Sequence, residues 1–562
     1  MKKILEHYND ELLFIREQGK EFALKYPTIA DKIDFNGNRS NDPQTERIIE
    51  SFAFMVARLS AKIDDNAEDL AYYLLAGLYP GITAVFPPCS VVQFDNKDFN
   101  FIPRHTQIRI PINVNQVANE FSDSYIFRTI YNLPVYPLQI TKLSINSVGE
   151  LKMDIKTLSV PIDRLPIEAI MFYINASIFD DAVNLYATLF NTTPKITIII
   201  NAKRYELPQD ALVLCGFNED ETAVPVPKFT NYSFHLLREV LLFPQKFLFF
   251  KIVGIDKLIK QYGLKDIDKF SICITLENTD VKIHKNSILI NAVPVANLFN
   301  YTTNSFRFDG TKSKYLLLSH KHPHLDVYSI KEVHLIDSQS KKDFIVPQYF
   351  SFDYNSLDNS ADAVYWLQPL DEEHSTYISF IDTNMRPTNI YADVAYAKTL
   401  CINKINLRNI SGNGKVRTDE ANAPNIIGKV VLQFTEPFWI EQHHSDMWNL
   451  LTQLGFGQLS RLSTYQLVNK LRQITSLYQS KYQNDILYIL DNIVKVDQIE
   501  TNRRMVHNGH SCFVKAYTYN ILCKTFRQQP YAVLFFKVLN RYLQNNRPIN
   551  SFLELKVVND SS

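Results

Sequence analysis

The chain has 562 residues, of which 59 are basic and 59 are acidic, so its formal net charge is zero. A zero balance gives no long-range attraction to nucleic acid or anionic lipid, and we expect neither as a direct partner. Apolar residues make up 46% of the chain and include 37 Phe and 30 Tyr, which excludes global disorder. The length predicts three or four domains of about 150 residues each.

Cysteine and glycine usage narrows the function further. The 6 cysteines are scattered without a C-x-x-C pair, which indicates a reducing, cytoplasmic compartment. The 15 glycines are well below average usage, so glycine-rich phosphate loops start from a low expectation. Polar residues directly follow the basic start, and charged residues interrupt the most apolar zone, near 240–255. We therefore expect neither a signal peptide nor a membrane-spanning helix.

The first eighty residues are written as helices. One set of residues recurs at alternating spacings of three and four, which places its members along one face of a helix. We call this set the first stripe; it consists of Leu5, Tyr8, Leu12, Ile15, Gly19, Phe22 and Tyr26. Pro27 should end this helix. A second helix should begin at Asp42-Pro43, with the stripe Ile48, Phe52, Met55 and Leu59. A third, short helix should run from Leu70 to Tyr79 and stop at Pro80.

The middle of the chain changes to strand patterns. Short segments rich in β-branched or aromatic residues predict strands at 90–94, 107–110, 196–200, 247–252 and 270–276. Helical patterns lie between them at 181–190 and 234–242. We find no repeat of 20 to 50 residues, which disfavours a solenoid or propeller.

The last segment returns to helix. Helical spacing extends over 461–490 and again over 531–543 after Pro530, with strands predicted at 512–523 and 549–558. The fold class is therefore α+β and multidomain, with an N-terminal helical bundle segment, β-rich middle domains and a C-terminal α+β domain. The expected domains are 1–85, 86–205, 206–425 and 426–562.

Two stretches partly match catalytic or metal-binding motifs, but each lacks a residue type that the motif requires. The run from Gly509 to Phe513 resembles a nucleophile elbow, but Phe513 replaces the second glycine that its sharp turn requires. His320, His322 and His324 have ligand-like spacing, yet the spacing specifies no Cys, Asp or Glu as a further ligand. We expect no catalytic residue, no metal and no cofactor.

Several stretches together resemble the TssF family, also called ImpG or VasA, a baseplate subunit of the bacterial type VI secretion system. The densest likeness is HYNDELLFIREQGKEFALKYPTIA from His7, DPQTERIIESFAFMVARLSAKIDD from Asp42 and LLAGLYP from Leu74. Weaker pieces are FRTIYNLPVYPLQI from Phe127, FPQKFLFF from Phe243 and INSFLEL from Ile549. The chain departs from the family's pattern at MWNLLTQLGFGQLS, from Met447.

The resemblance implies a non-enzymatic structural subunit. Two copies would combine with one TssG-like subunit into the core of a wedge that carries TssE-like and TssK-like subunits. Six wedges would surround the spike and start the tube and sheath. The chain would lie in the cytoplasm, docked at the inner membrane through other subunits. The alternative from the residues alone is an enzyme, such as a carbohydrate-active one, with a dispersed site in the β-rich middle.

Partner contacts are expected at positions that recur in the family or lie on the first stripe. These are Tyr8, Leu12, Ile15, Arg16, Gly19, Phe22, Tyr26, Arg47, Phe52, Arg58, Asn550, Ser551 and Phe552. Arginine is enriched at protein interfaces, which favours Arg16, Arg47 and Arg58. The first stripe has two interpretations: it packs inside its own chain, or it is kept for a partner.

Overall fold

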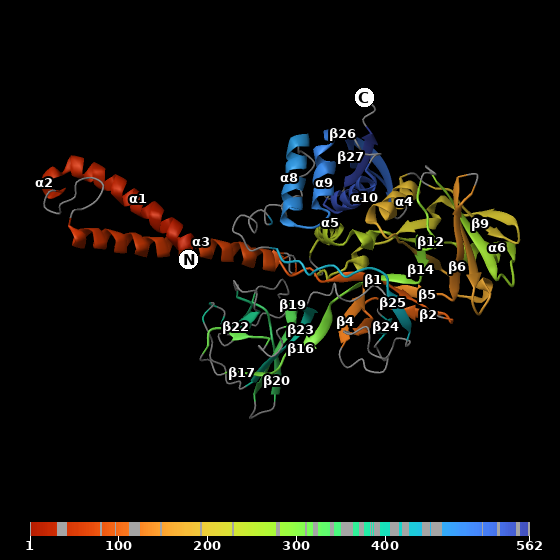
Figure 1. Ribbon diagram of the computed structural model, residues 1–562, viewed down its shortest axis with the longest axis horizontal. Helices are drawn as coiled ribbons and strands as arrows, with labels where there is room; N and C mark the ends of the chain where they lie inside the picture. The colour runs from red at the N-terminus through yellow and green to blue at the C-terminus, as the bar shows by residue number, and fades with distance from the viewer. Residues whose placement is uncertain are drawn as a thin grey trace. The chain divides into compact units, whose positions relative to one another are not determined.

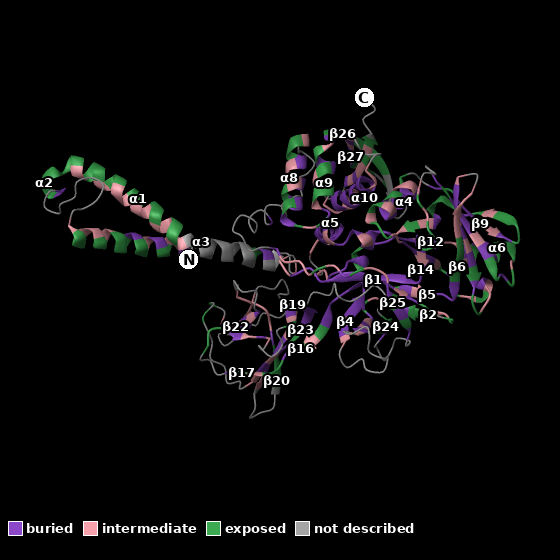
Figure 2. Cartoon of the chain, viewed as in Figure 1, coloured by how far each residue is buried: buried purple, intermediate pink, exposed green. Residues whose placement is uncertain are grey.

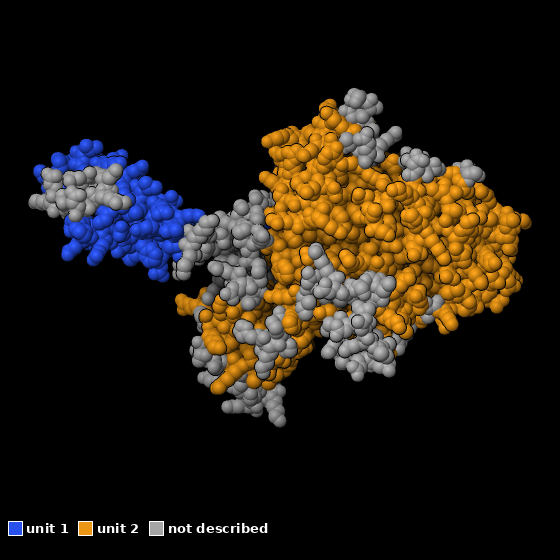
Figure 3. All heavy atoms as spheres, in the orientation of Figure 1, with its two compact units in different colours: residues 1–75, 443–451 blue, residues 76–442, 452–562 orange. Residues whose placement is uncertain are grey.

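The computed structural model describes most of the chain. The described residues are 2–30, 42–78, 81, 83–95, 97–111, 124–146, 149–191, 194–227, 230–276, 281–308, 312–318, 324–337, 342–349, 364–369, 376–382, 384, 386, 394–404, 415–418, 426–440, 450, 463–507, 510–524, 529–546 and 551–559. The chain divides into two compact units (Figure 3). Unit 1 holds residues 1–75 and 443–451, and unit 2 holds residues 76–442 and 452–562.

Unit 1 is helical. Helix α1 spans Lys2–Lys25, the single turn α2 spans Pro27–Ala30, and α3 spans Pro43–Leu78. Pro27 ends α1 as expected, although it also begins α2. The predicted third helix at 70–79 is wrong as a separate element, because α3 continues through it as one helix of 36 residues. Asp64, Asp65 and Asn66 are weak helix formers, but no proline or glycine stands between Pro43 and Gly77 to break the ladder.

A closed barrel lies in unit 2 (Figure 1). Its strands follow the order β1 (Cys89–Phe94), β15 (Ala292–Ala296), β4 (Ser124–Thr129), β3 (Gln107–Pro111), β24 (Lys415–Thr418) and β25 (Ile427–Val430). Val91 and Val92 of β1 are fully buried. Strands β1 and β25 approach so closely at Gly428 that a Cβ there would lie 2.6 Å from the Gln93 carbonyl oxygen. Only glycine fits that position.

Two antiparallel sheets are built from strands that lie in the sequence between barrel strands β4 and β15. One runs β10 (Lys203–Glu206), β9 (Ile196–Ile200), β13 (Lys269–Thr275), β7 (Glu150–Thr157) and β6 (Leu138–Ile145). The other runs β11 (Leu212–Leu214), β12 (Phe249–Val253), β8 (Ala169–Ile174) and β14 (Ile288–Ile290). The strands predicted at 196–200, 247–252 and 270–276 are confirmed in this region, with small shifts of their ends. Both sheets take strands from either side of residue 205, where we expected a domain boundary.

Helices and small strands complete this region. The helices are α4 (Phe179–Phe190), α5 (Ser233–Leu242) and α6 (Ile255–Tyr262), with the 3-10 turns η2 (Ile162–Arg164), η3 (Gln209–Ala211), η4 (Glu219–Glu221) and η5 (Pro244–Phe247). Strands β2 (Asn100–Ile102) and β5 (Leu133–Val135) pair with each other. The helices predicted at 181–190 and 234–242 are confirmed as α4 and α5.

Residues 299–403 add a further β layer that the sequence did not resolve into strands. One sheet joins β16 (Phe299–Thr302), β23 (Val394–Asn403), β19 (Leu325–Asp337) and β20 (Lys342–Val346), and β17 (Phe306–Arg307) also pairs with β23. A second sheet joins β18 (Tyr315–Leu316), β22 (Tyr377–Ile381) and β21 (Tyr365–Leu367). A shared core that includes Val333, Leu335, Trp366, Ile378 and Ala395 packs them together.

The C-terminal segment is an α+β layer. Strands β26 (Ile493–His507), β27 (His510–Cys523) and β28 (Ser551–Asn559) form one sheet, in which β28 runs parallel to β27. The helices are α8 (Thr464–Leu477), α9 (Gln483–Asp491) and α10 (Pro530–Asn545). The helical spacing over 461–490 corresponds to two helices, α8 and α9, because Tyr478 leaves the helical conformation. Both Tyr478 and Tyr482 are buried at the turn between the two helices.

The architecture confirms the mixed α+β class, with a helical N-terminus and a β-rich middle (Figure 1). Among the described residues, no helix is both long enough and apolar enough to cross a membrane.

Candidate partner interface

Helix α3 begins with the cap that its sequence predicts. The Asp42 carboxylate accepts hydrogen bonds from the backbone amides of Gln44 and Thr45, at 3.1 and 3.3 Å, and from the Thr45 hydroxyl at 2.8 Å. These bonds, led by that of the Thr45 side chain, hold the pKa of Asp42 below its usual value. Pro43 follows as the first helical residue, where its missing amide proton has no cost.

Helix α1 folds back beside α3 (Figure 1). Arg16 Nη2 lies 2.7 Å from Glu46 Oε1, and both side chains are about four-fifths buried, at 21% and 18% exposure. Ala53, Ala57 and Ala61 of α3 recur every four residues and are buried. Small residues at this spacing let a neighbouring helix approach closely. Unit 1 therefore contains a helical hairpin, although most of its large apolar side chains remain outside the contact.

Some residues of the first stripe are half-buried and the others are exposed to solvent. Tyr8, Leu12, Ile15 and Gly19 are half-buried, on the side of α1 from which Arg16 reaches α3. Leu5 stands at the start of the stripe and is exposed, as are Phe22 and Tyr26 at its end. Exposed positions occur along the length of α1 (Figure 2). The rings of Phe22 and Tyr26 lie 5.3 Å apart, centroid to centroid, and contact each other in the open. The central part of the stripe thus serves the hairpin, and its ends are open to solvent.

Helix α3 carries an open apolar face. We call it the α3 stripe and define it by Ile48, Phe52, Met55 and Leu59, which are 70%, 54%, 63% and 59% exposed. These residues follow each other at three- and four-residue spacing, so they lie along one side of the helix. Arg47 and Arg58 are exposed nearby. A continuous exposed apolar strip bordered by arginine is typical of a protein-interaction surface.

The third expected contact region lies in unit 2. Asn550 is outside the described residues. Ser551 is the first residue of β28 and is buried, and Phe552 beside it is half-buried. In this chain the Ser551 side chain therefore contributes to the packing of the C-terminal layer.

The serine motif and the histidine cluster noted in the sequence do not form a catalytic or metal site among the described residues. Ser511 lies inside strand β27 opposite Val506, not at the strand-to-helix turn on which a nucleophilic serine depends. His324 is exposed, and His320 and His322 are outside the described residues. Within the part of the chain that the structure describes, no three His, Cys, Asp or Glu side chains lie close enough to hold a metal ion.

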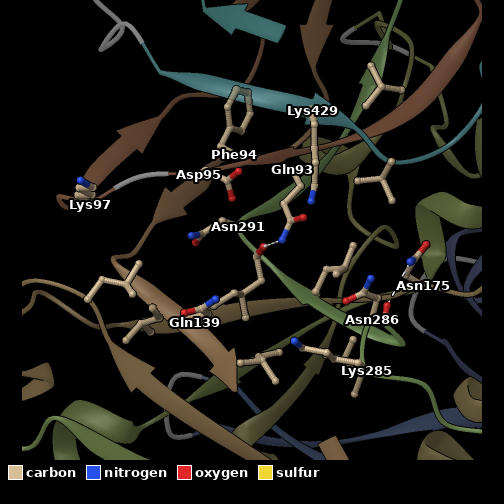
Figure 4. A pocket seen from close by; sticks show the side chains of 18 of the residues that line it. Gln93, Phe94, Asp95, Lys97, Gln139, Asn175, Lys285, Asn286, Asn291 and Lys429 are labelled. Carbon is tan, nitrogen blue, oxygen red and sulfur yellow. Dashed lines mark hydrogen bonds between the residues drawn. The ribbon is translucent and has the colours of Figure 1, made fainter. Parts of the chain in front are cut away.

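A groove of about 990 Å³ lies among β1, β6, β14 and β25 (Figure 4). Amide side chains such as Gln93, Gln139 and Asn286 line it, together with Lys285 and Lys429. Its carboxylates, Asp95 and Asp98, are exposed, whereas a general acid requires a shielded carboxyl group. The aromatic ring in its wall, Phe94, is buried and offers no platform for a sugar. The groove gives little support to an enzyme in the β-rich middle.

A buried polar cluster holds the first residues of unit 2, and no sequence pattern predicts it. We define it as Arg238, Glu239 and Lys246, all of which are almost fully buried. Arg238 donates to the carbonyl oxygens of Gly81 and Ala84. Its guanidinium also lies 5.3 Å from the centre of the Phe86 ring. These contacts secure the segment that follows α3.

Charge pairing satisfies the rest of the cluster. Lys246 donates to Glu239 Oε2, and Glu239 Oε1 accepts the backbone amide of Ala223 at 2.7 Å. Burial lowers the pKa of Lys246, while the neighbouring Glu239 carboxylate acts in the opposite direction. A helical pattern over 234–242 predicts α5, but no periodicity signals that two of its residues are charged and buried.

The fold and the open apolar face of α3 are those of a multidomain α+β protein that presents an uncovered helical surface. Comparison with known families gives the particular assignment. The family model described as "Type VI secretion system, TssF" matches residues 1–562, and the chain therefore belongs to the TssF family.

One relative in sequence and two solved structures are similar to this chain over nearly its whole length. The chain is 22% identical over 605 aligned positions to the type VI secretion system component TssF1 of Pseudomonas aeruginosa, covering 98% of this chain and 96% of that protein. A chain in a solved TssK-TssF-TssG baseplate subcomplex superposes with a TM-score of 0.72 at 18% identity, covering 92% of this chain and 96% of the other. A chain in a type VI baseplate complex gives 0.53 at 16% identity, with coverage of 99% and 97%. These structures share the fold.

Proposed function

We propose that this chain is a structural, non-enzymatic subunit of the type VI secretion baseplate. Membership of the TssF family carries the proposal, and the two similar folds both come from baseplate assemblies. The exposed α3 stripe gives it a physical basis, because an uncovered apolar face of this kind needs a partner.

The partner we propose for unit 1 is a TssG-like subunit, with two copies of this chain for each copy of that subunit. Coexpression of the two chains should give a soluble complex, and native mass spectrometry should give the two-to-one ratio. TssK-like and TssE-like subunits, the spike, and the base of the tube and sheath would contact the assembled wedge. This places the chain in the cytoplasm, held at the inner membrane through other subunits. A monodisperse monomer that fails to capture the TssG-like chain contradicts the proposal.

The α3 stripe can be tested separately from folding. The double variant Phe52→Ser/Leu59→Ser removes two exposed side chains, so its thermal unfolding should match that of the unaltered chain while capture of the TssG-like subunit falls at least tenfold, or roughly 1.4 kcal/mol. Tyr465→Ser is the control, because Tyr465 is a large residue on α8 that is even more exposed, at 75%. Undiminished capture by the double variant would remove the α3 stripe from the interface.

The centre of the first stripe calls for a different variant. Leu12→Asp and Ile15→Asp place charges on the half-buried face of α1. If the face packs only on α3, hydrogen exchange in α1 should rise while the remaining folded protein still captures its partner. If it also serves the partner, capture should fall by more than the folded fraction. The first outcome would restrict the interface to the α3 stripe and the exposed stripe ends.

We also propose that the chain needs neither metal nor catalytic residue. Ser511→Ala and His324→Ala should leave secretion unchanged at equal protein levels. Elemental analysis of the complex should give no stoichiometric zinc, copper or iron. One metal ion per chain, lost together with His324, would contradict this.

A further inference from the structure

Strand β26 is the longer of the two edge strands of the C-terminal sheet, with 15 residues against 9 in β28. Strand β27 is paired on both sides, with β26 antiparallel and β28 parallel. Strand β26 has 15 residues and pairs only with β27 within the described part of the chain. An unpaired edge of this length can accept another strand.

The direction of its backbone groups follows from one contact. The Val496 amide donates to Thr464 Oγ1 of α8 at 3.0 Å, and the Thr464 hydroxyl donates back to the Val496 carbonyl at 3.4 Å. The amide and carbonyl groups of Val496 are therefore directed toward α8 and away from the neighbouring strand β27. In an antiparallel pair alternate residues point the same way, so Gln498, Glu500, Asn502 and Arg504 also turn their backbone groups outward. Among the described residues, none hydrogen-bonds to the backbone of these four.

Nothing in this segment protects the edge. It contains no proline, and the one register shift, between Ile493 and Lys495, comes before it. Residues 497–504 are exposed on both faces of the strand. Natural sheets usually cover such an edge or interrupt it with proline or a bulge. An open, regular edge therefore indicates a strand that joins it.

The charges on β26 indicate which strand joins. Its first half carries Asp497 and Glu500 together with Lys495, which pairs with Asp497 at 2.9 Å, so Glu500 is the acidic group left over there. Its second half carries Arg503 and Arg504 and is basic. Antiparallel pairing of two such strands sets the acidic half of each against the basic half of the other. Parallel pairing sets like charges together, which is destabilising.

We propose that β26 pairs edge to edge and antiparallel with β26 of a second copy of this chain. The outward amide and carbonyl groups of the two strands form hydrogen bonds when Asn502 of one copy lies opposite Asn502 of the other across a two-fold axis. Glu500 of each copy then lies opposite Arg504 of the other, on the same face of the joined sheet. The result is one continuous sheet of six strands.

The existing ion pairs are compatible with this register. Lys515 of β27 lies 2.7 Å from Glu500, but both side chains are at least half exposed, so Glu500 can accept Arg504 as well. Arg503 pairs with Glu554 of β28 at 2.9 Å. Arg504 has no ion-pair partner among the residues described. The contact is small compared with a standard interface of about 1,600 Å², so it should be weak in the free chain.

The inference does not depend on the TssG-like subunit, because it needs only two copies of this chain. Its test is a site-specific disulfide in the full chain carrying Cys512→Ser and Phe52→Ser/Leu59→Ser, which removes the nearby thiol and unrelated contacts through the α3 stripe. Asn502→Cys should form a disulfide-linked dimer, because residues facing each other in this type of pair have Cα atoms about 5.5 Å apart. Gln498→Cys is the matched control: it has the same orientation but lies four residues from the axis.

Charge reversal then tests the register. Glu500→Arg and Arg504→Glu should each weaken the dimer about fivefold in dissociation constant, and the double variant should restore it. Circular dichroism should be unchanged in all three. Equal crosslinking at 502 and 498, or crosslinking that ignores both single reversals, would overturn the proposal. Capture of the TssG-like subunit is measured in parallel on chains that keep Phe52 and Leu59, and it reports only on the proposed function.

Discussion

His235 shows how burial of a single side chain ties stability to pH. It is buried in α5 beside Arg238 and Lys246, and its Nδ1 atom is buried without a hydrogen-bond partner among the described residues. Burial, and secondarily the two positive charges, lowers the pKa of His235 to about 3. The folded chain therefore keeps this imidazole neutral at pH values where an unfolded chain protonates it.

The first prediction concerns the pH dependence of unfolding. Because the folded pKa is depressed, stability is complete above the ordinary pKa of 6.5 and is lost as pH falls toward 3. Between pH 7 and pH 5 the group should cost about 2 kcal/mol of unfolding free energy. His235→Phe should remove that part of the loss in urea unfolding measured at both pH values. His324→Gln, at an exposed histidine, should leave the loss unchanged; an equal loss in both variants would contradict the assignment.

The second prediction concerns the buried polar cluster. Lys246→Met leaves the Glu239 carboxylate buried with the Ala223 amide as its remaining donor among the described residues, and should destabilise unit 2 by about 3–5 kcal/mol. Adding Glu239→Gln removes the uncompensated charge and keeps an acceptor for Ala223, so most of the loss should be recovered. Urea midpoints of the single and double variants measure this. A double variant as unstable as the single one would show that packing, not charge, is lost.

At the scale of elements, α3 buries Ala53, Ala57 and Ala61 along one side, and we expect this side to face α1. The third prediction is that Ala57→Leu, which enlarges a fully buried residue, destabilises the hairpin by about 1–3 kcal/mol. Amide hydrogen exchange in α1 should accelerate accordingly. Leu59→Ala, two positions later on the exposed α3 stripe, is the control and should leave exchange in α1 unchanged. Unchanged exchange in both would mean that α1 does not pack on this face.

The sequence predicted elements best where one periodicity dominates. The strand at 196–200 and the helix after Pro530 have a single buried face or a continuous apolar run, and both are confirmed. Strand β26 was missed because its distal half is exposed on both faces and shows no alternation. The α3 stripe was read from the sequence, but spacing cannot tell whether a stripe is covered by its own chain. The contacts of Arg238 with Gly81 and Ala84 join residues over 150 positions apart, which no local pattern records.

At the scale of the whole molecule, we expect unit 1 to bind the partner and unit 2 to fold independently of it. The fourth prediction is that a chain lacking residues 1–75 keeps unit 2 folded, because the barrel and sheets are built from its own strands. Its melting temperature should stay within a few degrees of that of unit 2 in the full chain, and capture of the TssG-like subunit should be lost. Pull-down and calorimetry measure the two properties. Retained capture would move the partner surface to unit 2.

The closure of the barrel has a consequence for biosynthesis. Strand β1 pairs with β15 and β25, whose residues follow it by about 200 and 340 positions. At translation rates of ~5–20 residues per second, Val92 leaves the ribosome roughly 20–70 s before its partner Val430. During that interval the nascent strand has an unsatisfied edge, and such long-range pairing is intrinsically slow. Yield in the cell should therefore depend on chaperones that shield the growing chain, and slower translation at low temperature should raise it.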